Sequence, residues 1–139
     1  MCTRLLWTTE GQPVLVARNM DWTERMGTKL YAMPRGIERQ GMTPTNPMKW
    51  TSKYGSVVGA IWNAASADGM NEAGLVANLL YLAESNYGDR DAALAGLSVS
   101  VWAQYYLDNF ATVADAVEAA EIVQIVPFRL THKLSLIHI

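Results

Sequence analysis

The chain opens with the stretch that decides its fold, CTRLLWTTEGQPVLVARNMDW, at residues 2–22. Two runs typical of β-strands, at 2–8 and 13–20, flank a short segment that carries the turn glycine Gly11. We therefore predict a β-hairpin at the start of the chain. The end of its second strand must then lie beside the N-terminus.

The register of this hairpin decides which side chains meet. With Glu10 and Gly11 as a two-residue turn, Cys2 is predicted to face Asn19. Arg18 then lies nearly opposite Cys2. A slip of one or two residues would change the paired partners but would keep the two strand ends together.

The middle of the chain predicts more strands. They are expected at residues 28–34, 53–62, 65–70 and 74–82. The last two form a second hairpin around residues 71–74. Residues 35–52 are polar and rich in proline and glycine, and are predicted to form a long connection.

The pattern changes to helices in the last third. Residues 97–110 predict a deeply buried helix, because apolar positions surround most of the helical wheel. A second helix is predicted from Thr112, which begins a Thr-x-x-Asp start signal, and 122–128 is a strand or a loop. Strands followed by helices favour an α+β layered fold in one domain, without an internal boundary.

Composition excludes several classes of protein. The 139 residues are 50% hydrophobic and 17% charged, which suits a packed core rather than disorder. The net charge is -2 and the 11 Lys and Arg are scattered, so no nucleic-acid surface is predicted. No apolar run is long enough to span a membrane. The sequence leaves the compartment open: cytoplasmic as written, or periplasmic if an export signal has been removed.

The single cysteine, Cys2, is the main candidate for chemistry. Removal of Met1 would give it a free α-amine, so one residue would hold a thiol nucleophile and a nearby base. Asp21, just past the second strand, could hold that amine, and Arg18 could favour the thiolate. The alternative is that Arg18 and Asp21 form an ordinary surface ion pair.

Five motifs resemble the choloylglycine hydrolase family, which includes the penicillin V acylases, in the right order. They are CTR at 2–4, ARNMDW at 17–22, WTSKYGS at 50–56, DGMNEAGL at 68–75 and WAQYYLDNF at 102–110. The resemblance implies the four-layer αββα fold of N-terminal-nucleophile hydrolases and hydrolysis of linear amide C–N bonds. It matches Cys2 to the nucleophile, Arg18 to an active-site arginine and Asp21 to the carboxylate near the amine.

The resemblance also bears on the substrate. Tyr81 stands where bile salt hydrolases carry an oxyanion-binding asparagine, and an aromatic residue there is similar to penicillin V acylases of Gram-negative type, as is Trp22. Trp22 and Tyr81 are therefore expected to line an acyl pocket, which favours penicillin V or N-acyl-homoserine lactones over conjugated bile salts. The alternative is that both are plain core aromatics.

The chain is expected to be the N-terminal portion of a longer domain. Family members extend well beyond 139 residues, and their further active-site Asn and Arg lie downstream. The last five residues, 135–139, resemble translated adapter sequence, so His132 and His138 are discounted. This portion alone is expected to aggregate and to be weak or inactive. Full-length relatives are often tetramers, so a homo-oligomer is expected for the full-length protein.

Three functions remain open on sequence alone. The first is an acylase acting on a small amide substrate, with no metal or cofactor expected, since no Cys/His cluster is present. The second is an inactive fragment or a non-catalytic binding module of the same fold. The third is an enzyme of the glutamine-amidotransferase type, which also uses an N-terminal cysteine.

Overall fold

The computed structural model describes residues 2–127. Its elements are β1 (Cys2–Trp7), β2 (Leu15–Met20), β3 (Lys29–Met33), β4 (Glu38–Gln40), β5 (Lys49–Thr51), β6 (Ser56–Ile61), β7 (Ala65–Asn71), β8 (Val76–Asn78), β9 (Gly96–Ser98), a 3-10 helix η1 (Val99–Val101), α1 (Trp102–Asn109), α2 (Val113–Ala120) and β10 (Gln124–Val126). Strands dominate the first part and helices follow, which confirms the predicted α+β class. Residues 128–139, including both histidines and the stretch 135–139, lie outside the described part.

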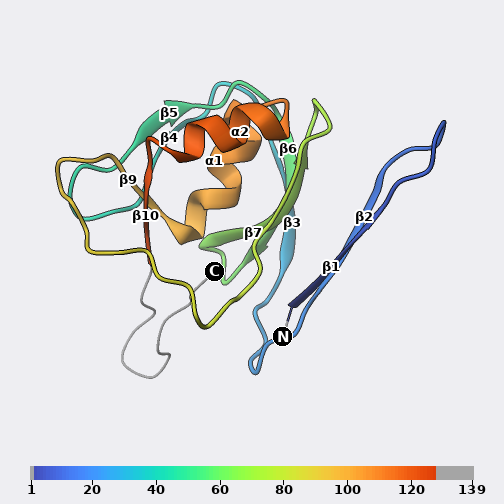
Figure 1. Ribbon diagram of the computed structural model, residues 1–139, viewed down its shortest axis with the longest axis horizontal. Helices are drawn as coiled ribbons and strands as arrows, with labels where there is room; N and C mark the ends of the chain where they lie inside the picture. The colour runs from blue at the N-terminus through green and yellow to red at the C-terminus, as the bar shows by residue number, and fades with distance from the viewer. Residues whose placement is uncertain (1, 128–139) are drawn as a thin grey trace.

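The body of the molecule is a sheet with helices on one face. Its strand order is β3-β6-β7-β8, and every neighbouring pair in it is antiparallel. Helix α1 packs directly on this sheet, with α2 beyond it (Figure 1). Gly69 on β7 permits the close approach, because a Cβ there would stand 2.5 Å from Leu107 Cδ1 and 2.9 Å from Val58 Cγ1.

A buried carboxylate lies beneath this packing. Asp108 of α1 is fully buried, and its oxygens accept hydrogen bonds from Trp50 Nε1 at 2.7 Å and Gln104 Nε2 at 2.7 Å. Arg39 Nε lies 2.8 Å from Asp108 Oδ2 as an ion pair. A buried charge requires such partners, so these contacts tie three elements together.

The predicted long connection at 35–52 is wrong, because it contains the short antiparallel pair β4–β5. Arg39 and Trp50 are register partners in this pair, and both reach Asp108. The buried carboxylate thus holds two strands that the local sequence alone does not specify.

The second helix is as predicted and the second hairpin is present, but its second strand, expected over 74–82, is only Val76–Asn78, and the first helix begins later than predicted. Thr112 Oγ1 caps α2 by accepting a hydrogen bond from the Asp115 amide at 3.2 Å. Residues 96–101 instead form β9 and η1, with Ser98 as the cap of η1. Strand β9 pairs in parallel with β10, which settles residues 124–126 as a strand.

The predicted N-terminal hairpin is present, but its register differs by one residue. Cys2 faces Met20 rather than Asn19. The turn lies where expected: the Gln12 amide donates to Thr9 O at 3.0 Å, and Gly11 has a φ of 73°. The observed register, with Trp7 opposite Leu15, leaves three residues, Glu10 to Gln12, at the tip of the hairpin instead of the two expected, and this moves the pairing by one residue.

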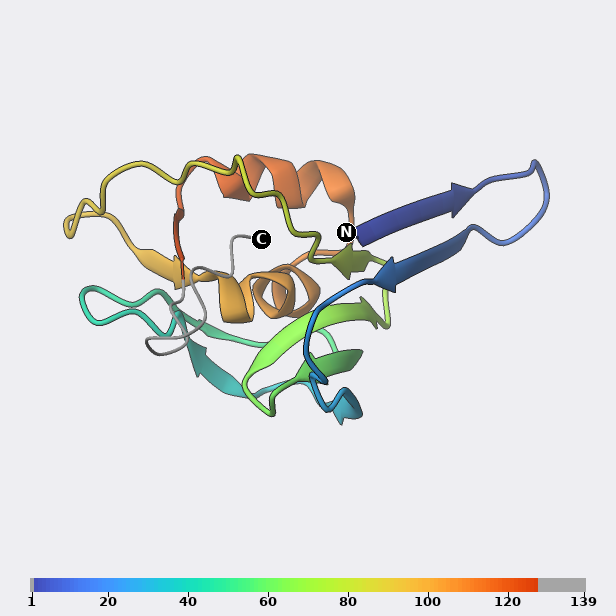
Figure 2. The same cartoon turned by 90° about the horizontal axis from the view of Figure 1, so that it is seen from below.

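This shift moves Arg18 to the face that carries Cys2. In an antiparallel pair, opposed residues share a face, so Cys2 and Met20 lie on the same side as Arg4 and Arg18. Figure 2 shows that the rest of the hairpin extends away from the body. The end of the hairpin that carries Cys2 is therefore the end closest to the sheet.

Candidate active site

Cys2 is half-buried at the edge of a small cavity of about 30 Å³. The cavity lies where β1 and β2 meet the central sheet. Its lining consists of Cys2, Met20, Trp22, Met26, Ile61, Trp62, Ala67, Leu79 and Tyr81. The structure thus brings together three of the five residues selected from the sequence, namely Cys2, Trp22 and Tyr81.

Aromatic rings form much of the cavity wall. The Trp22 ring lies 5.6 Å from that of Tyr81 and 6.3 Å from that of Trp62, measured between centroids, and both pairs are edge-to-face. The indole Nε1 of Trp22 is buried and has no hydrogen-bond partner among residues 2–127. The wall is therefore formed largely of aromatic and other apolar side chains.

Arg18 lies beside the cavity and ties the hairpin to the sheet. Its side chain is only 9% exposed, and its Nε lies 2.9 Å from Asp68 Oδ1. The N–H does not aim at that oxygen, so the contact is an ion pair rather than a hydrogen bond. A second nitrogen, Nη2, donates to the Leu79 carbonyl. A buried guanidinium with these partners is not the surface ion pair with Asp21 that the sequence left open.

Asp21 is exposed and directly follows Met20, the register partner of Cys2. Asp21 therefore lies one position beyond the residue that faces Cys2 across the hairpin. Beside it, the Asn19 side-chain oxygen accepts from the Thr3 amide at 2.9 Å, which fixes this end of the hairpin. The contact between Asp21 and a free α-amine of Cys2 stays a prediction, because Met1 lies outside the described residues.

Sequence reasoning missed several residues of this site. Trp62 and Met26 belong to the cavity wall, and Asp68 binds Arg18. Asp68 gave the clearest available signal, since a carboxylate inside a strand between buried residues requires a cation or donors. Trp62 gave none, because its contribution depends on the packing of β6 against the segment after β2.

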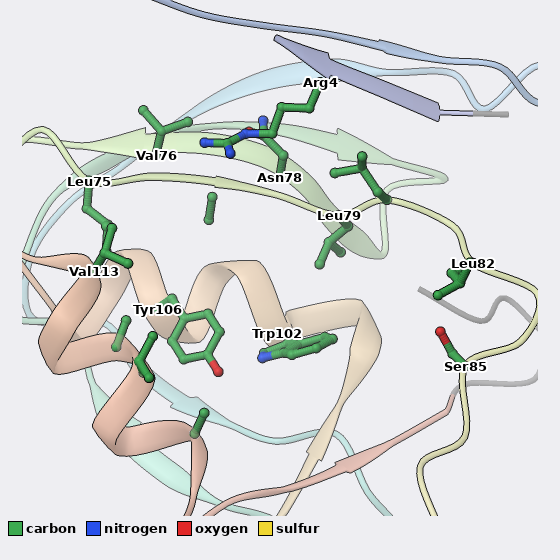
Figure 3. A pocket seen from close by; sticks show the side chains of 15 residues that line it. Arg4, Leu75, Val76, Asn78, Leu79, Leu82, Ser85, Trp102, Tyr106 and Val113 are labelled. Atoms are coloured by element: carbon green, nitrogen blue, oxygen red, sulfur yellow. The ribbon is translucent and has the colours of Figure 1, made fainter. Parts of the chain in front are cut away.

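A second, larger hollow of about 710 Å³ adjoins the site (Figure 3). Apolar side chains from β8, α1 and α2 line it, including Trp102, Tyr106 and Val113, and Arg4 stands at its edge. Leu79 lines both this hollow and the cavity at Cys2.

Within residues 2–127 there is no cluster of His, Cys, Asp and Glu that could hold a metal ion. No helix in the same range is long and apolar enough to cross a bilayer.

Comparison with known proteins decides the family. The family model of linear amide C-N hydrolases, choloylglycine hydrolase family, matches residues 2–138. The chain belongs to the choloylglycine hydrolase family. The resemblance inferred from the motifs is therefore confirmed over almost the whole sequence.

Individual relatives in this family agree with that assignment. The penicillin V acylase of Pectobacterium atrosepticum (strain SCRI 1043) is 43% identical over 129 residues, which cover 86% of this chain and 34% of that protein. The solved penicillin V acylase from Agrobacterium tumefaciens is 49% identical with a TM-score of 0.85, covering 91% of this chain and 40% of that one. A conjugated bile acid hydrolase from Clostridium perfringens, solved as the C2A mutant, is 26% identical with a TM-score of 0.75, covering 96% and 42%.

These solved structures confirm the predicted fold class, that of N-terminal-nucleophile hydrolases. The chain spans only about two fifths of the solved relatives, and about a third of the curated one. Identity is higher to the two penicillin V acylases, at 49% and 43%, than to the bile acid hydrolase, at 26%.

Proposed function

We propose that this chain carries the nucleophile of an acylase that hydrolyses a linear amide C–N bond. The observation that carries the proposal is the position of Cys2, at the first residue of a strand and at the edge of an aromatic cavity. A nucleophile there can attack a carbonyl whose acyl group rests against the rings. Membership of a family of linear amide hydrolases supports the reaction class.

The reaction runs in two steps on one residue. After loss of Met1, the Cys2 thiolate attacks the amide carbonyl carbon, the C–N bond breaks, and the amine leaves with a proton taken from the α-ammonium of Cys2. The α-amine then takes a proton from water as the water oxygen attacks the thioester carbonyl, the C–S bond breaks, and the acid leaves with the thiolate and α-ammonium of Cys2 restored. Asp21 holds the amine at this end of the hairpin, and Arg18 supplies positive charge on the same face.

The acyl group is proposed to be aryl or long-chain, as in penicillin V or an N-acyl-homoserine lactone, rather than a conjugated bile acid. The cavity of about 30 Å³ holds roughly one water molecule, so an acyl group must displace part of the wall. Tyr81 is 38% exposed and can move without disrupting the core. An aryl group would then stack against Trp22 in its place.

Intact-mass measurement on the full chain tests the nucleophile. An acylating inhibitor directed at cysteine is expected to add one adduct to protein that has lost Met1, and none to the Cys2→Ser control. Retained Met1, or equal labelling of both proteins, would contradict the proposal in favour of an inactive fragment or a binding module.

Hydrolysis assays test the substrate class. Release of phenoxyacetate from penicillin V, or of a fatty acid from an N-acyl-homoserine lactone, is expected to exceed release of glycine from a conjugated bile salt. Ammonia release from glutamine alone would favour the amidotransferase alternative. A Tyr81→Asn variant should shift the preference toward the bile salt, while Tyr31→Asn, on an exposed part of β3, should not.

A further inference from the structure

Two cross-strand pairs face each other where the hairpin meets the sheet. Arg4 and Arg18 are register partners on β1 and β2, and Asp68 and Asn78 are register partners on β7 and β8. Arg18 contacts Asp68 at 2.9 Å, while Arg4 Nε donates to Asn78 Oδ1 at 2.9 Å. Figure 3 shows the Arg4 side chain reaching from β1 to Asn78.

The two contacts are joined into a single network. Asn78 Nδ2 donates to Asp68 Oδ1 at 3.0 Å, so the carboxylate that pairs with Arg18 also anchors the amide that binds Arg4. Each residue of one pair is thereby matched to a residue of the other. We call these four residues, Arg4, Arg18, Asp68 and Asn78, the clamp.

The clamp is an unfavourable arrangement unless all of its members are present. Like charges directly opposite each other on neighbouring strands repel, and Arg4 faces Arg18 in this way. Arg18 is moreover nine-tenths buried, and its Nη1 has no hydrogen-bond partner in the described range. The negative charge of Asp68 offsets both the repulsion between the two arginines and the cost of burying Arg18. Apolar residues at these positions would join the hairpin to the sheet without either cost.

We propose that Asp68 is the positioning residue of Arg18, and that the clamp holds the hairpin so that Cys2 stays at the aromatic cavity. This inference rests on the proposed acylase function. Cys2 is two residues from Arg4 and on the same face of β1, so a tilt of the hairpin at the clamp moves the nucleophile directly. Misplacement by about 1 Å is enough to lower a rate by about 100-fold.

Kinetics of the full chain test this role. Asp68→Asn keeps the shape of the side chain and removes its charge, and should lower kcat by about 10- to 100-fold with little change in KM, because ground-state binding to the rings is retained. In an Arg18→Gln background the same change should cause little further loss, since Asp68 acts through Arg18. Asp89→Asn, at an exposed loop position outside the site, is the matched control.

Hydrogen exchange gives a readout that does not depend on turnover. Asp68→Asn should speed amide exchange in β1 and β2 while leaving α1 protected. Unchanged hairpin exchange, or equal losses in the wild-type and Arg18→Gln backgrounds, would overturn the inference. Faster hairpin exchange in a chain whose wild type hydrolyses no amide would support the clamp and contradict the proposed function, so the two failures are distinguishable.

Discussion

The β1–β2 hairpin and the region where α1 packs on β6 and β7 are both built on antiparallel strands, yet they are buried very differently. Trp7 and Leu15, opposed near the far end of the hairpin, are 60% and 62% exposed. Val58 and Leu107, where α1 meets the sheet, are fully buried, and so is the charged Asp108.

The difference shows that strand pairing and burial have separate causes. The hairpin forms from its own turn and alternating pattern, without a layer to cover its outer half. The sheet is buried because α1 supplies contacts from far along the chain, as in the hydrogen bond from Asn71 Nδ2 to Leu107 O, 36 positions away. Only the end of the hairpin at Cys2 and Arg18 shares in that second kind of support.

The largest effect on stability is expected from a substitution in the buried region, at Asp108. Asp108→Ala leaves Arg39 without its counter-ion and removes the acceptor of Trp50, so the free energy of unfolding should fall by about 3–5 kcal/mol. Urea unfolding followed by tryptophan fluorescence measures this loss. Asp108→Asn keeps an acceptor oxygen and should lose less, and a loss below about 1 kcal/mol in the alanine variant would contradict the assigned role.

Substitutions in the outer half of the hairpin should change the free energy of unfolding much less. Replacing Trp7 and Leu15 together by serine should change the free energy of unfolding by about 0.5 kcal/mol or less, because both side chains are mostly in solvent. It should also reduce self-association, since contiguous exposed apolar surface promotes it. Light scattering at several protein concentrations measures self-association. If the double variant associates as strongly as wild type, the associating surface lies elsewhere.

The smallest effect concerns an exposed pair at the rim of the sheet. Two hydrogen bonds from Arg35, both at 2.6 Å, together with one from the Gly55 amide, lower the pKa of Glu72 from 4.5 to about 2. A lowered folded-state pKa stabilises the protein above about pH 4.5, and that contribution is lost as the pH falls through about 2.

Glu72→Gln should therefore be less stable than wild type at pH 7, and equally stable near pH 2. Unfolding midpoints measured between these values at low salt would show the two curves converging on acidification. Because the pair is exposed, added salt should narrow the gap at pH 7. If the midpoints of the two proteins differ by the same amount at every pH, titration of Glu72 does not contribute to the loss of stability in acid.

The sequence predicted what depends on near neighbours. The hairpin around Gly11 and the helix capped by Thr112 follow from local turn and capping chemistry, and both are present. Cys2, Trp22 and Tyr81 line one cavity, while the acyl-pocket role that the family resemblance implies for Trp22 and Tyr81 stays a prediction.

The features that the sequence did not predict depend mostly on residues far apart in the chain. Strands β4 and β5 are held by Asp108, 58 positions beyond Trp50, so a window of local sequence reads them as a loop. The register differs by one residue because the loop at the tip has three residues rather than two, which alternation alone does not decide. Asp68 and Asn78 acquire their roles only when the hairpin folds onto the sheet.

The wide sequence separation in the clamp sets an order of events during synthesis. Arg4 can bind Asn78 only after the ribosome has added a further 74 residues to the chain. At about 5–20 residues per second, the ribosome takes roughly 4–15 seconds to supply that partner. Until then the clamp cannot form, so β1 and β2 can pair with each other before they are attached to the sheet.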